Sequence, residues 1–488
     1  MSYGINSLST RTKLIAGALA LVMAGMSHAS GTIVGGGATL PSLGYVGTGA
    51  ANPNTPQVFG SSVDAHSLFG AALGTGVSYC LTGSGAGKNI LAGIANNSVQ
   101  NACPTDSTGT LHGFGAPAVS RTDLTQPNFA GADAPLSSTD FSNYIGAHGS
   151  NNPVEFPAVA GAVAIAFNLK DNTGATVTGS EVNFTDTQLC KIFSGQVTVW
   201  NDPQLTGQAT GSTNAYSLPA GHSIPANPIN VQYRSDGSGT TFSFSNHLAA
   251  ACNTTTNPIE TSQNFFSTSA SPYVVQNFFG GSSHPALPSN WTGSSGNPAV
   301  ARAINATSNS IGYVEAANAL HTVDSNGNPI TLQFADVGGK SPTADFGSAL
   351  TLVALSVQAN AAIGSTNNTN GTPTVVALSN PNKALTTGSN ACIVLVKPAD
   401  YAVPGSTPGF INPTGNYPIV AVSYLLGNTV GNGTDQANTQ TLATAPYNST
   451  IRSSVTTIGG TTGLQFINPN TAFNTSTNPS QVSNCYGL

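Results

Sequence analysis

Charged side chains are scarce in this sequence, at 6% of its 488 residues against about 25% in ordinary globular proteins. With 12 lysines and arginines against 18 acidic residues, the chain has no basic surplus for a phosphate backbone, which argues against nucleic-acid binding. Regular charges flanking apolar heptads are absent, which excludes a coiled coil. The 55 glycines and 30 prolines follow no fixed period, so the chain is not collagen-like. Apolar residues still make up 39%, enough for a sizeable core, unlike most disordered chains.

The first 29 residues have the organisation of a secretory signal peptide. Arg11 and Lys13 precede an apolar run from Leu14 to Ala24, and Ser27 and Ala29 place small residues before a cleavage site. The run is too short to span a bilayer, so a membrane anchor is the less favoured alternative, and no later run is long enough for a transmembrane helix. Cleavage near Ala29 would leave 10 basic and 18 acidic residues, a net charge of −8. We expect a bacterial protein that is periplasmic or secreted.

Six cysteines follow this segment, and no two of them form a CxxC pair. In an exported protein, an even number without that spacing favours disulfides over metal ligation. Sequence order favours pairing of nearest neighbours, but spacing alone leaves other pairings open. The favoured pairs are Cys80–Cys103, Cys190–Cys252 and Cys392–Cys485. The histidines are scattered and form no cluster with metal spacing, so we expect neither a metal site nor a cofactor.

Short apolar runs alternate with helix-like segments, which predicts an α/β architecture, and the length suggests two or three domains. Strands are expected from Thr32 to Val34, Val159 to Phe167, Ile229 to Tyr233, Ser310 to Val314 and Tyr417 to Val422. Helices are expected from Thr187 to Phe193, Thr241 to Ala251 and Pro298 to Ala306. Stretches rich in Asn, Thr, Gly and Ser, at 202–226, 364–390 and 426–450, are interpreted as surface loops.

The clearest functional signal is the loop from Arg234 to Thr241, between an expected strand and an expected helix. Backbone N–H groups at the start of a helix, together with the helix dipole, make such a loop a ready site for an anion. Arg234 adds a guanidinium that can bind an oxyanion through two hydrogen bonds, and Asp236 could hold that guanidinium in place. The remaining candidate donors are Ser238, Gly239 and Thr240. An ordinary capped helix after a turn is the simpler alternative.

Two further loops repeat this pattern. The segment from Gly35 to Pro41 follows the first expected strand, and its Thr39 hydroxyl and nearby backbone N–H groups could face an anion. The segment from Thr82 to Lys88 is rich in glycine but is not a nucleotide-binding P-loop, because Thr82 replaces the first glycine of that motif. No G-x-S-x-G nucleophile motif surrounds Ser238 either. Flexible linkers remain the alternative for both segments.

Taken together and in chain order, these segments resemble the phosphate-binding proteins of the Pst transporter, and more closely their DING relatives. The resemblance covers nearly the whole chain after the first 29 residues. Residues 36–41 resemble the family's G-G-A-T-L-P start, 83–87 its G-S-G-x-G loop, 130–136 its A-G-x-D-x-x-L motif, 189–195 its F-S-G segment and 233–241 its R-x-[DE]-x-S-G-T-T loop.

The resemblance implies a type II periplasmic-binding-protein fold, in which two α/β lobes joined by crossovers close on a ligand in the cleft between them. We assign residues 30–158 and 317–488 to the first lobe and residues 159–316 to the second. The phosphate ligands carried over from the family are Thr39, Leu40, Ser84, Asp133, Arg234, Ser238, Gly239 and Thr240, and Asp236 matches the residue that orients the arginine.

The matching carboxylate predicts selectivity between anions. Near neutral pH phosphate keeps a proton, and the Asp133 carboxylate could accept a hydrogen bond from it. Sulfate has no such proton, so we expect phosphate to be preferred over sulfate by roughly 10⁴-fold or more.

The expected function is therefore capture of inorganic phosphate by a monomer, for an ABC-type importer or for extracellular scavenging, without catalysis. Two alternatives stay open: a secreted DING-like phosphatase, and an extracellular surface or adhesive protein that keeps the fold. Cys190–Cys252 fits a DING disulfide, but Cys392 precedes residues 417–419 whereas its DING counterpart follows them. The resemblance therefore supports the last pairing least.

Overall fold

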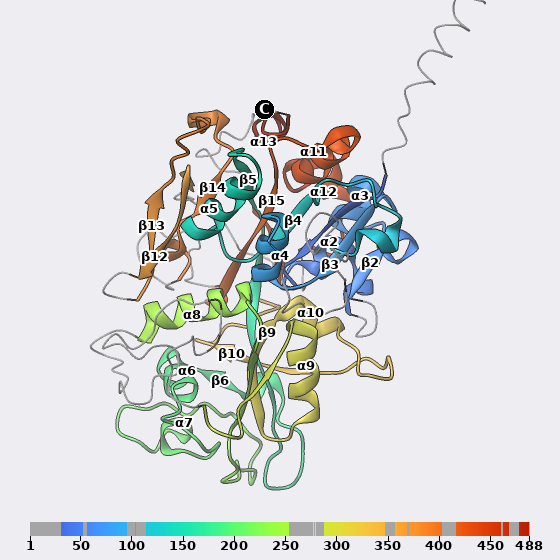
Figure 1. Cartoon of the computed structure of the whole chain (residues 1–488). Helices are drawn as coiled ribbons and strands as arrows, with labels where there is room; N and C mark the ends of the chain where they lie inside the picture. The colour runs from blue at the N-terminus through green and yellow to red at the C-terminus, as the bar shows by residue number, and fades with distance from the viewer. Residues whose placement is uncertain are drawn as a thin grey trace, which may run out of the picture.

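Figure 1 shows the computed structural model of the chain. The structure describes residues 31–51, 56–94, 103, 114–252, 277, 279, 287–346, 357–367, 371–402, 416–459, 462–467 and 478–487. The signal peptide expected over the first 29 residues lies outside these ranges. In the part of the chain that the structure describes, no helix has both the length and the apolar character needed to cross a membrane.

One large sheet organises the fold, and it has twelve strands among the described residues. Its main path runs β2-β3-β1-β4-β15-β5-β9-β7-β8, and β6, β10 and β16 pair off that path. The strands of the path are β1 (Ile33–Gly37), β2 (Gln57–Phe59), β3 (Val77–Leu81), β4 (Phe129–Ala132), β5 (Pro153–Asn168), β7 (Asn230–Arg234), β8 (Thr292–Ser294), β9 (Ser310–Glu315) and β15 (Val420–Asn428). The others are β6 (Asn183–Phe184), β10 (Gln333–Val337) and β16 (Leu464–Phe466).

Strand β5 joins the two halves of this sheet. Its residues 153–162 pair antiparallel with β15, and its residues 163–168 pair antiparallel with β9. Nearly every residue of β5 is buried, as expected for a strand that reads as a continuous apolar run. In Figure 1 the strand runs between an upper body, which holds β1 to β4 and β15, and a lower body, which is built around β9 and the strands paired beyond it.

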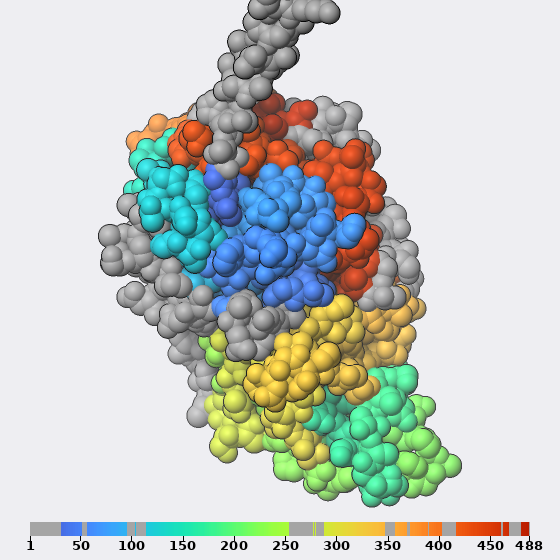
Figure 2. Space-filling view, turned by 90° about the vertical axis from the view of Figure 1, so that its right-hand side faces the viewer, coloured from blue at the N-terminus to red at the C-terminus, as the bar shows by residue number. Residues whose placement is uncertain are grey.

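Helices cover both bodies. Those of the upper body are α2 (Ser42–Val46), α3 (Leu68–Leu73), α4 (Ser84–Leu91), α5 (Ser138–Ala147), α11 (Gln436–Thr444), α12 (Ser449–Ser454) and α13 (Asn478–Asn484). Those of the lower body are α6 (Asp186–Phe193), α7 (Pro203–Thr206), α8 (Gly239–Cys252), α9 (Asn297–Ala306) and α10 (Ala316–His321). Capping boxes start α5 and α6, because the hydroxyls of Ser137 and Thr185 accept from the third helical N–H. Figure 2 shows the N-terminal part of the upper body lying on the α9–α10 region, and α2 contacts α10.

The strands and helices expected from the sequence are present, with ends shifted by up to six residues, at the start of β5 and the end of β15. The prediction of surface loops is partly wrong for two of the three segments, because these contain strands or helices. The end of β12 (Ala361–Asn367) and all of β13 (Pro373–Ala377) lie within 364–390, and these two strands pair antiparallel. Within 426–450 lie α11 and the start of α12, because α11 buries Thr439, Leu442 and Ala443 and packing outweighs the weak helix propensity of its polar sequence. The stretch 202–226 is largely loop, apart from α7.

The lobe division expected from the sequence stays a prediction. Two features lie near its boundaries: β5 changes partner between residues 162 and 163, and β9 ends at Glu315. Strand β10 lies beyond the second boundary, yet it pairs with residues 165–167 of β5 and with β6. That strand is therefore part of the lower body.

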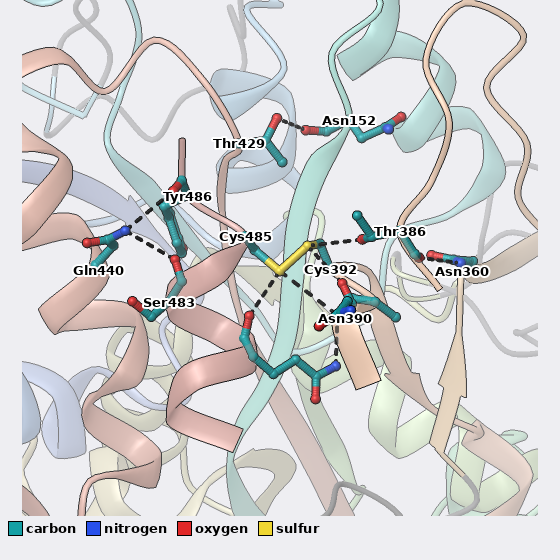
Figure 3. The surroundings of a disulfide bond; sticks show 12 residues. Asn152, Asn360, Thr386, Asn390, Cys392, Thr429, Gln440, Ser483, Cys485 and Tyr486 are labelled. Carbon is teal, nitrogen blue, oxygen red and sulfur yellow. Dashed lines mark hydrogen bonds between the residues drawn. A yellow bond between two sulfur atoms is a disulfide. The ribbon is translucent and has the colours of Figure 1, made fainter. Parts of the chain in front are cut away.

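Three disulfides join Cys80 to Cys103, Cys190 to Cys252 and Cys392 to Cys485, the nearest-neighbour pairing that sequence order favours. The second ties α6 to the end of α8 in the lower body. The third ties α13 to the segment before β14 (Val394–Val396), which pairs with β11 (Val357–Ala359). Figure 3 shows its surroundings, where the Thr386 hydroxyl donates to Cys392 Sγ at 3.3 Å.

Candidate functional site

The Gly-rich loops of the upper body lie where parallel strands end. Strand β1 pairs in parallel with both β3 and β4, so the residues after these strands emerge at one edge of the sheet. Thr39 follows β1, Ser84 begins α4 after β3, and Asp133 follows β4 directly. In the lower body β7 pairs in parallel with β8 and β9 and ends at Arg234. Open α/β sheets bind ligands outside the carboxyl ends of their strands, so these loops define the candidate site.

Two glycines allow the loops to approach one another closely. Gly37 has a φ of +127°, and a Cβ on it would lie 2.1 Å from the carbonyl oxygen of Gly131 in β4. Gly83 has a φ of +83°, and a Cβ on it would lie 2.6 Å from Asp236 Oδ2. Glycine is the residue that tolerates such positive φ values at no steric cost. The loop after β3 thus reaches the arginine loop, and the Gly85 N–H donates to the Gly237 carbonyl at 2.9 Å.

The arginine of this site is buried and paired with an acidic neighbour. Arg234 is 1% exposed, its Nε donates to Asp236 Oδ1 at 2.6 Å, and its Nη2 donates to Oδ2. Its Nη1 donates to Thr240 Oγ1 at 3.2 Å. Asp236 also accepts from the Gly296 N–H at 3.1 Å. Both carboxylate oxygens of Asp236 therefore accept from the guanidinium. This geometry is compatible with the expected role of Asp236 in orienting Arg234.

Asp133 is a buried carboxylate with one unsatisfied oxygen. The residue is 1% exposed, its N–H donates to Ser84 Oγ at 3.0 Å, and the Ser84 hydroxyl donates to Oδ2 at 3.3 Å. Oδ1 accepts no hydrogen bond from the described residues. Burial raises the pKa of this carboxyl to about 7, against the opposing effects of the Ser423 hydroxyl and Arg234. Near neutral pH the group can therefore act as an acceptor or, once protonated, as a donor.

The N-terminus of α8 lies beside this carboxylate. The backbone of Gly239, the first residue of the helix, packs against Asp133 and Ser84. Ser238 Oγ accepts from the Thr241 N–H at 3.1 Å and so caps the helix. The helix has 14 residues, and its first amides and the positive end of its dipole favour an anion at this end.

The structure brings together the binding residues named from the sequence, and all of them are buried. Arg234 contacts Thr240, Asp133 contacts Ser84, and the Leu40 amide lies close enough to lower the pKa of Asp133. Thr39 is linked to Thr240 through a residue that sequence reasoning missed. The paired cysteines lie elsewhere and contribute no group to this cluster.

The residue that links Thr39 to Thr240 is Asn297, the first residue of α9. Two further residues, Asn318 and Glu315, support the same region and were also missed from the sequence. Asn318 Nδ2 donates to the carbonyls of Thr39 and Leu40, and so holds the loop after β1. Glu315 accepts from the N–H groups of Ala317 and Asn318, each at 2.7 Å, and burial raises the pKa of its carboxyl to about 8. A signal for Asn297 exists in the sequence, since a glycine precedes it and the expected helix follows, as in the other loops.

The assembled groups define what the site can do chemically. Its donors are hydroxyls, helix amides and a guanidinium whose charge is balanced by a neighbouring carboxylate. Among the described residues of the site, the unsatisfied acceptor is Asp133 Oδ1. Such a set suits a small oxyanion that carries a proton of its own. Within the described ranges, no group of three or more His, Cys, Asp or Glu side chains could hold a metal ion.

Comparison with known proteins gives this cluster a family context. A family model described as the PBP superfamily domain matches residues 57–381. Alkaline phosphatase L of Pseudomonas aeruginosa is 31% identical over 248 residues, which cover 50% of this chain and 49% of that protein. The phosphate-binding protein PstS 3 of Mycobacterium leprae is 32% identical over 176 residues, which cover 35% of this chain and 42% of that protein. The chain thus spans less than half the length of these curated relatives.

A solved structure extends the comparison over nearly the whole chain. A high-affinity periplasmic phosphate-binding protein named PfluDING, determined with bound phosphate, matches 93% of this chain and 99% of its own, with 21% identity and a TM-score of 0.53. At this identity the likeness establishes the fold alone. The type II periplasmic-binding-protein fold expected from the sequence is confirmed.

Proposed function

This chain belongs to the PBP superfamily, and on that premise we propose that it captures inorganic phosphate at the junction of its two bodies. The phosphate-binding role is assigned to Thr39, Leu40, Ser84, Asp133, Arg234, Ser238, Gly239 and Thr240, with Asp236 orienting the arginine. Most of these donors are neutral, and the Arg234–Asp236 pair adds no net charge. A site of this kind relies on oriented dipoles, which suits a chain with so few charges.

The main support for the proposal is that Asp133 Oδ1 is buried without a hydrogen-bond donor among the described residues. A buried acceptor without a donor costs roughly 1–3 kcal/mol, so the site favours a ligand that supplies its own hydrogen. Phosphate near neutral pH is such a ligand, and its bare oxygens match Arg234 and the N-terminus of α8. Sulfate would place bare negative oxygen against the carboxylate.

The relatives support the same ligand. PstS 3 is named a phosphate-binding protein, and PfluDING was determined with phosphate bound. Because the chain covers less than half of PstS 3, the transfer of that ligand to this chain is part of the proposal.

The proposed setting is outside the cytoplasm. Cleavage near Ala29 would release the chain into the periplasm or the medium, where it would deliver phosphate to an ABC-type permease or scavenge it. We assign residues 30–158 and 317–488 to one lobe and 159–316 to the other, except that α10 and β10 pack with the second lobe. A monomer with two lobes that close on the anion would suffice for this task.

Isothermal titration tests the proposal directly. The protein is first freed of any bound anion by unfolding, dialysis and refolding. It is then titrated with phosphate, arsenate and sulfate at about pH 8.5, where Asp133 is mostly ionised because its pKa is about 7. We expect binding of phosphate and of the similarly protonated arsenate, and none of sulfate at comparable concentration. No heat with phosphate on refolded, ligand-free protein would overturn the proposal.

Hydrolysis of a phosphate ester is the second candidate, because one relative is named alkaline phosphatase L. That reaction needs an activated nucleophile or a metal ion, and the described residues assemble no metal-binding group. We expect no turnover of a chromogenic phosphate ester. Turnover that resists chelators and copurifies with the protein through several columns would favour this candidate instead.

A further inference from the structure

Asn297 lies between two hydroxyl groups of the proposed phosphate site. It is the first residue of α9 and is fully buried. Its Nδ2 donates to Thr39 Oγ1 at 3.1 Å and to Thr240 Oγ1 at 3.1 Å, and its backbone N–H donates to Thr39 Oγ1 at 3.3 Å. One side chain therefore contacts both a residue of the upper body and a residue of the lower body.

The orientation of this amide is set by its other end. Asn297 Oδ1 accepts from the backbone N–H of Glu315 at 3.2 Å. A backbone N–H can only donate, so the oxygen of the amide must face it and the NH₂ group must face the two hydroxyls. The donating role of Nδ2 thus follows from the surrounding backbone.

The hydrogen bonds that Thr39 and Thr240 accept determine where their hydroxyl protons can point. A hydroxyl can accept two hydrogen bonds and donate one. Thr39 Oγ1 accepts from the Asn297 backbone and side chain, and Thr240 Oγ1 accepts from Asn297 Nδ2 and Arg234 Nη1. Both acceptor positions of each oxygen are in use, so each proton remains to be donated. Neither hydroxyl donates to an acceptor among the described residues.

We propose that Asn297 is a positioning residue, which directs the hydroxyl protons of Thr39 and Thr240 towards the bound phosphate. The inference rests on the proposed function and adds to it a residue that contacts the ligand only through others. Its physical effect is preorganisation: the hydroxyl dipoles are turned to the anion before it arrives, so binding does not have to reorient them. Because Thr39 and Asn297 belong to different bodies, the arrangement is complete only when the bodies are closed.

Two substitutions of Asn297 test this role by titration with inorganic phosphate. Asn297→Ala leaves both hydroxyls free to rotate, and we expect phosphate affinity to fall by about 10- to 100-fold, roughly tenfold for each oriented hydroxyl. Asn297→Asp keeps the shape of the side chain but replaces the donating group by an acceptor, so both hydroxyls turn towards it and affinity falls further. An acidic residue at the first position of a helix favours folding, which makes this the variant to use if the alanine variant unfolds.

The matched control lies on the same helix. Asn305 is an exposed residue of α9, and Asn305→Ala and Asn305→Asp should leave phosphate affinity unchanged. Equal affinity of Asn297→Ala and the wild type would overturn the inference.

A double-mutant cycle separates positioning from a merely structural role. If Asn297 acts through the hydroxyls, combining Asn297→Ala with Thr39→Val or with Thr240→Val should cost at least about threefold less than the product of the single losses. Losses that simply multiply would show that Asn297 supports the fold and would overturn the inference. Failure of the proposed function gives a different result, because the wild type itself would then not bind phosphate.

Discussion

The backbone of Gly239 packs directly against the side chain of Asp133. A Cβ built on Gly239 would lie 2.4 Å from Asp133 Cβ and 2.6 Å from Ser84 Oγ, closer than real Cβ atoms approach. Gly239 begins α8 in the lower body, whereas Asp133 and Ser84 belong to loops of the upper body. Any side chain at position 239 therefore opposes the closed arrangement of the two bodies.

We predict that Gly239→Ala weakens phosphate binding by about 100-fold or more while shifting the melting temperature of ligand-free protein by less than about 3 °C. The added methyl group collides with atoms of the other body, so the chain can relieve the conflict by opening instead of unfolding. Titration calorimetry and thermal melts measure the two effects. Gly146→Ala is the matched control, because a Cβ on this residue of α5 meets nothing within 4 Å. Unchanged affinity in Gly239→Ala would contradict the prediction.

Replacement of Arg234 should damage both binding and stability, and the two effects can be separated. Arg234→Ala removes the guanidinium and leaves Asp236 as a buried carboxylate without its main partner, which costs about 3–5 kcal/mol of unfolding free energy. Adding Asp236→Ala removes that charge and should recover part of the stability, but phosphate binding should stay absent. Denaturant titrations and calorimetry give the comparison. Recovery of binding in the double variant would place the anion away from Arg234.

Asp133→Asn should reduce the discrimination between phosphate and sulfate. An amide can donate a hydrogen bond to sulfate oxygen, which the carboxylate cannot. We expect the ratio of the two affinities to fall by at least about 100-fold. The wild type should behave similarly in acid, because protonation of Asp133 below its raised pKa of about 7 converts the acceptor into a donor. Competition titrations at several pH values test both statements, and a constant ratio in variant and wild type alike would refute the selectivity mechanism.

The ligand-free protein should lose stability as the pH rises from about 4 to about 8. Burial raises the pKa of Asp133 to about 7 and those of Glu155 and Glu315 to about 8. In the unfolded chain these carboxyls titrate near 4, so the folded state binds more protons throughout this interval. The free energy of unfolding therefore falls with increasing pH, and we expect the melting temperature to drop by at least about 5 °C between pH 5 and pH 8.

Glu155→Gln provides the control for this pH dependence. Glu155 Oε1 accepts from the Leu136 N–H at 2.7 Å, and a glutamine oxygen can accept in the same way without titrating. The variant should show a smaller loss of melting temperature between pH 5 and pH 8. An equal or larger loss would mean that other groups determine the pH profile.

The loops of the site could be located from the sequence because their positions follow from chain order. Residues after parallel strands must meet at one edge of a sheet, and Thr39, Ser84 and Asp133 each follow such a strand. The motif around Arg234 likewise places an arginine, an acidic residue and the start of a helix within a few positions of each other. Patterns of this kind involve only neighbouring residues, so the order of amino acids is enough to find them.

Asn297 and α11 show where such patterns stop being informative. Asn297 contacts Thr39 and Thr240, which lie 258 and 57 positions away. The glycine before it and the helix after it mark a loop, but they do not reveal these contacts. The sequence of α11 is mostly polar and contains three threonines and an asparagine, which are weak helix formers, so its helical state depends on burial of Leu442 and its neighbours. Both features depend on contacts made only after folding.

The three disulfides also determine how an oxidising environment affects this molecule. Cys80–Cys103 and Cys392–Cys485 close rings within the upper body, Cys190–Cys252 closes a ring within the lower body, and none of the six cysteines is left free. No cross-link runs from one body to the other. The disulfides therefore stabilise each body against unfolding but leave the two bodies free to move relative to one another. Stability outside the cell can thus increase without slowing exchange of the bound anion.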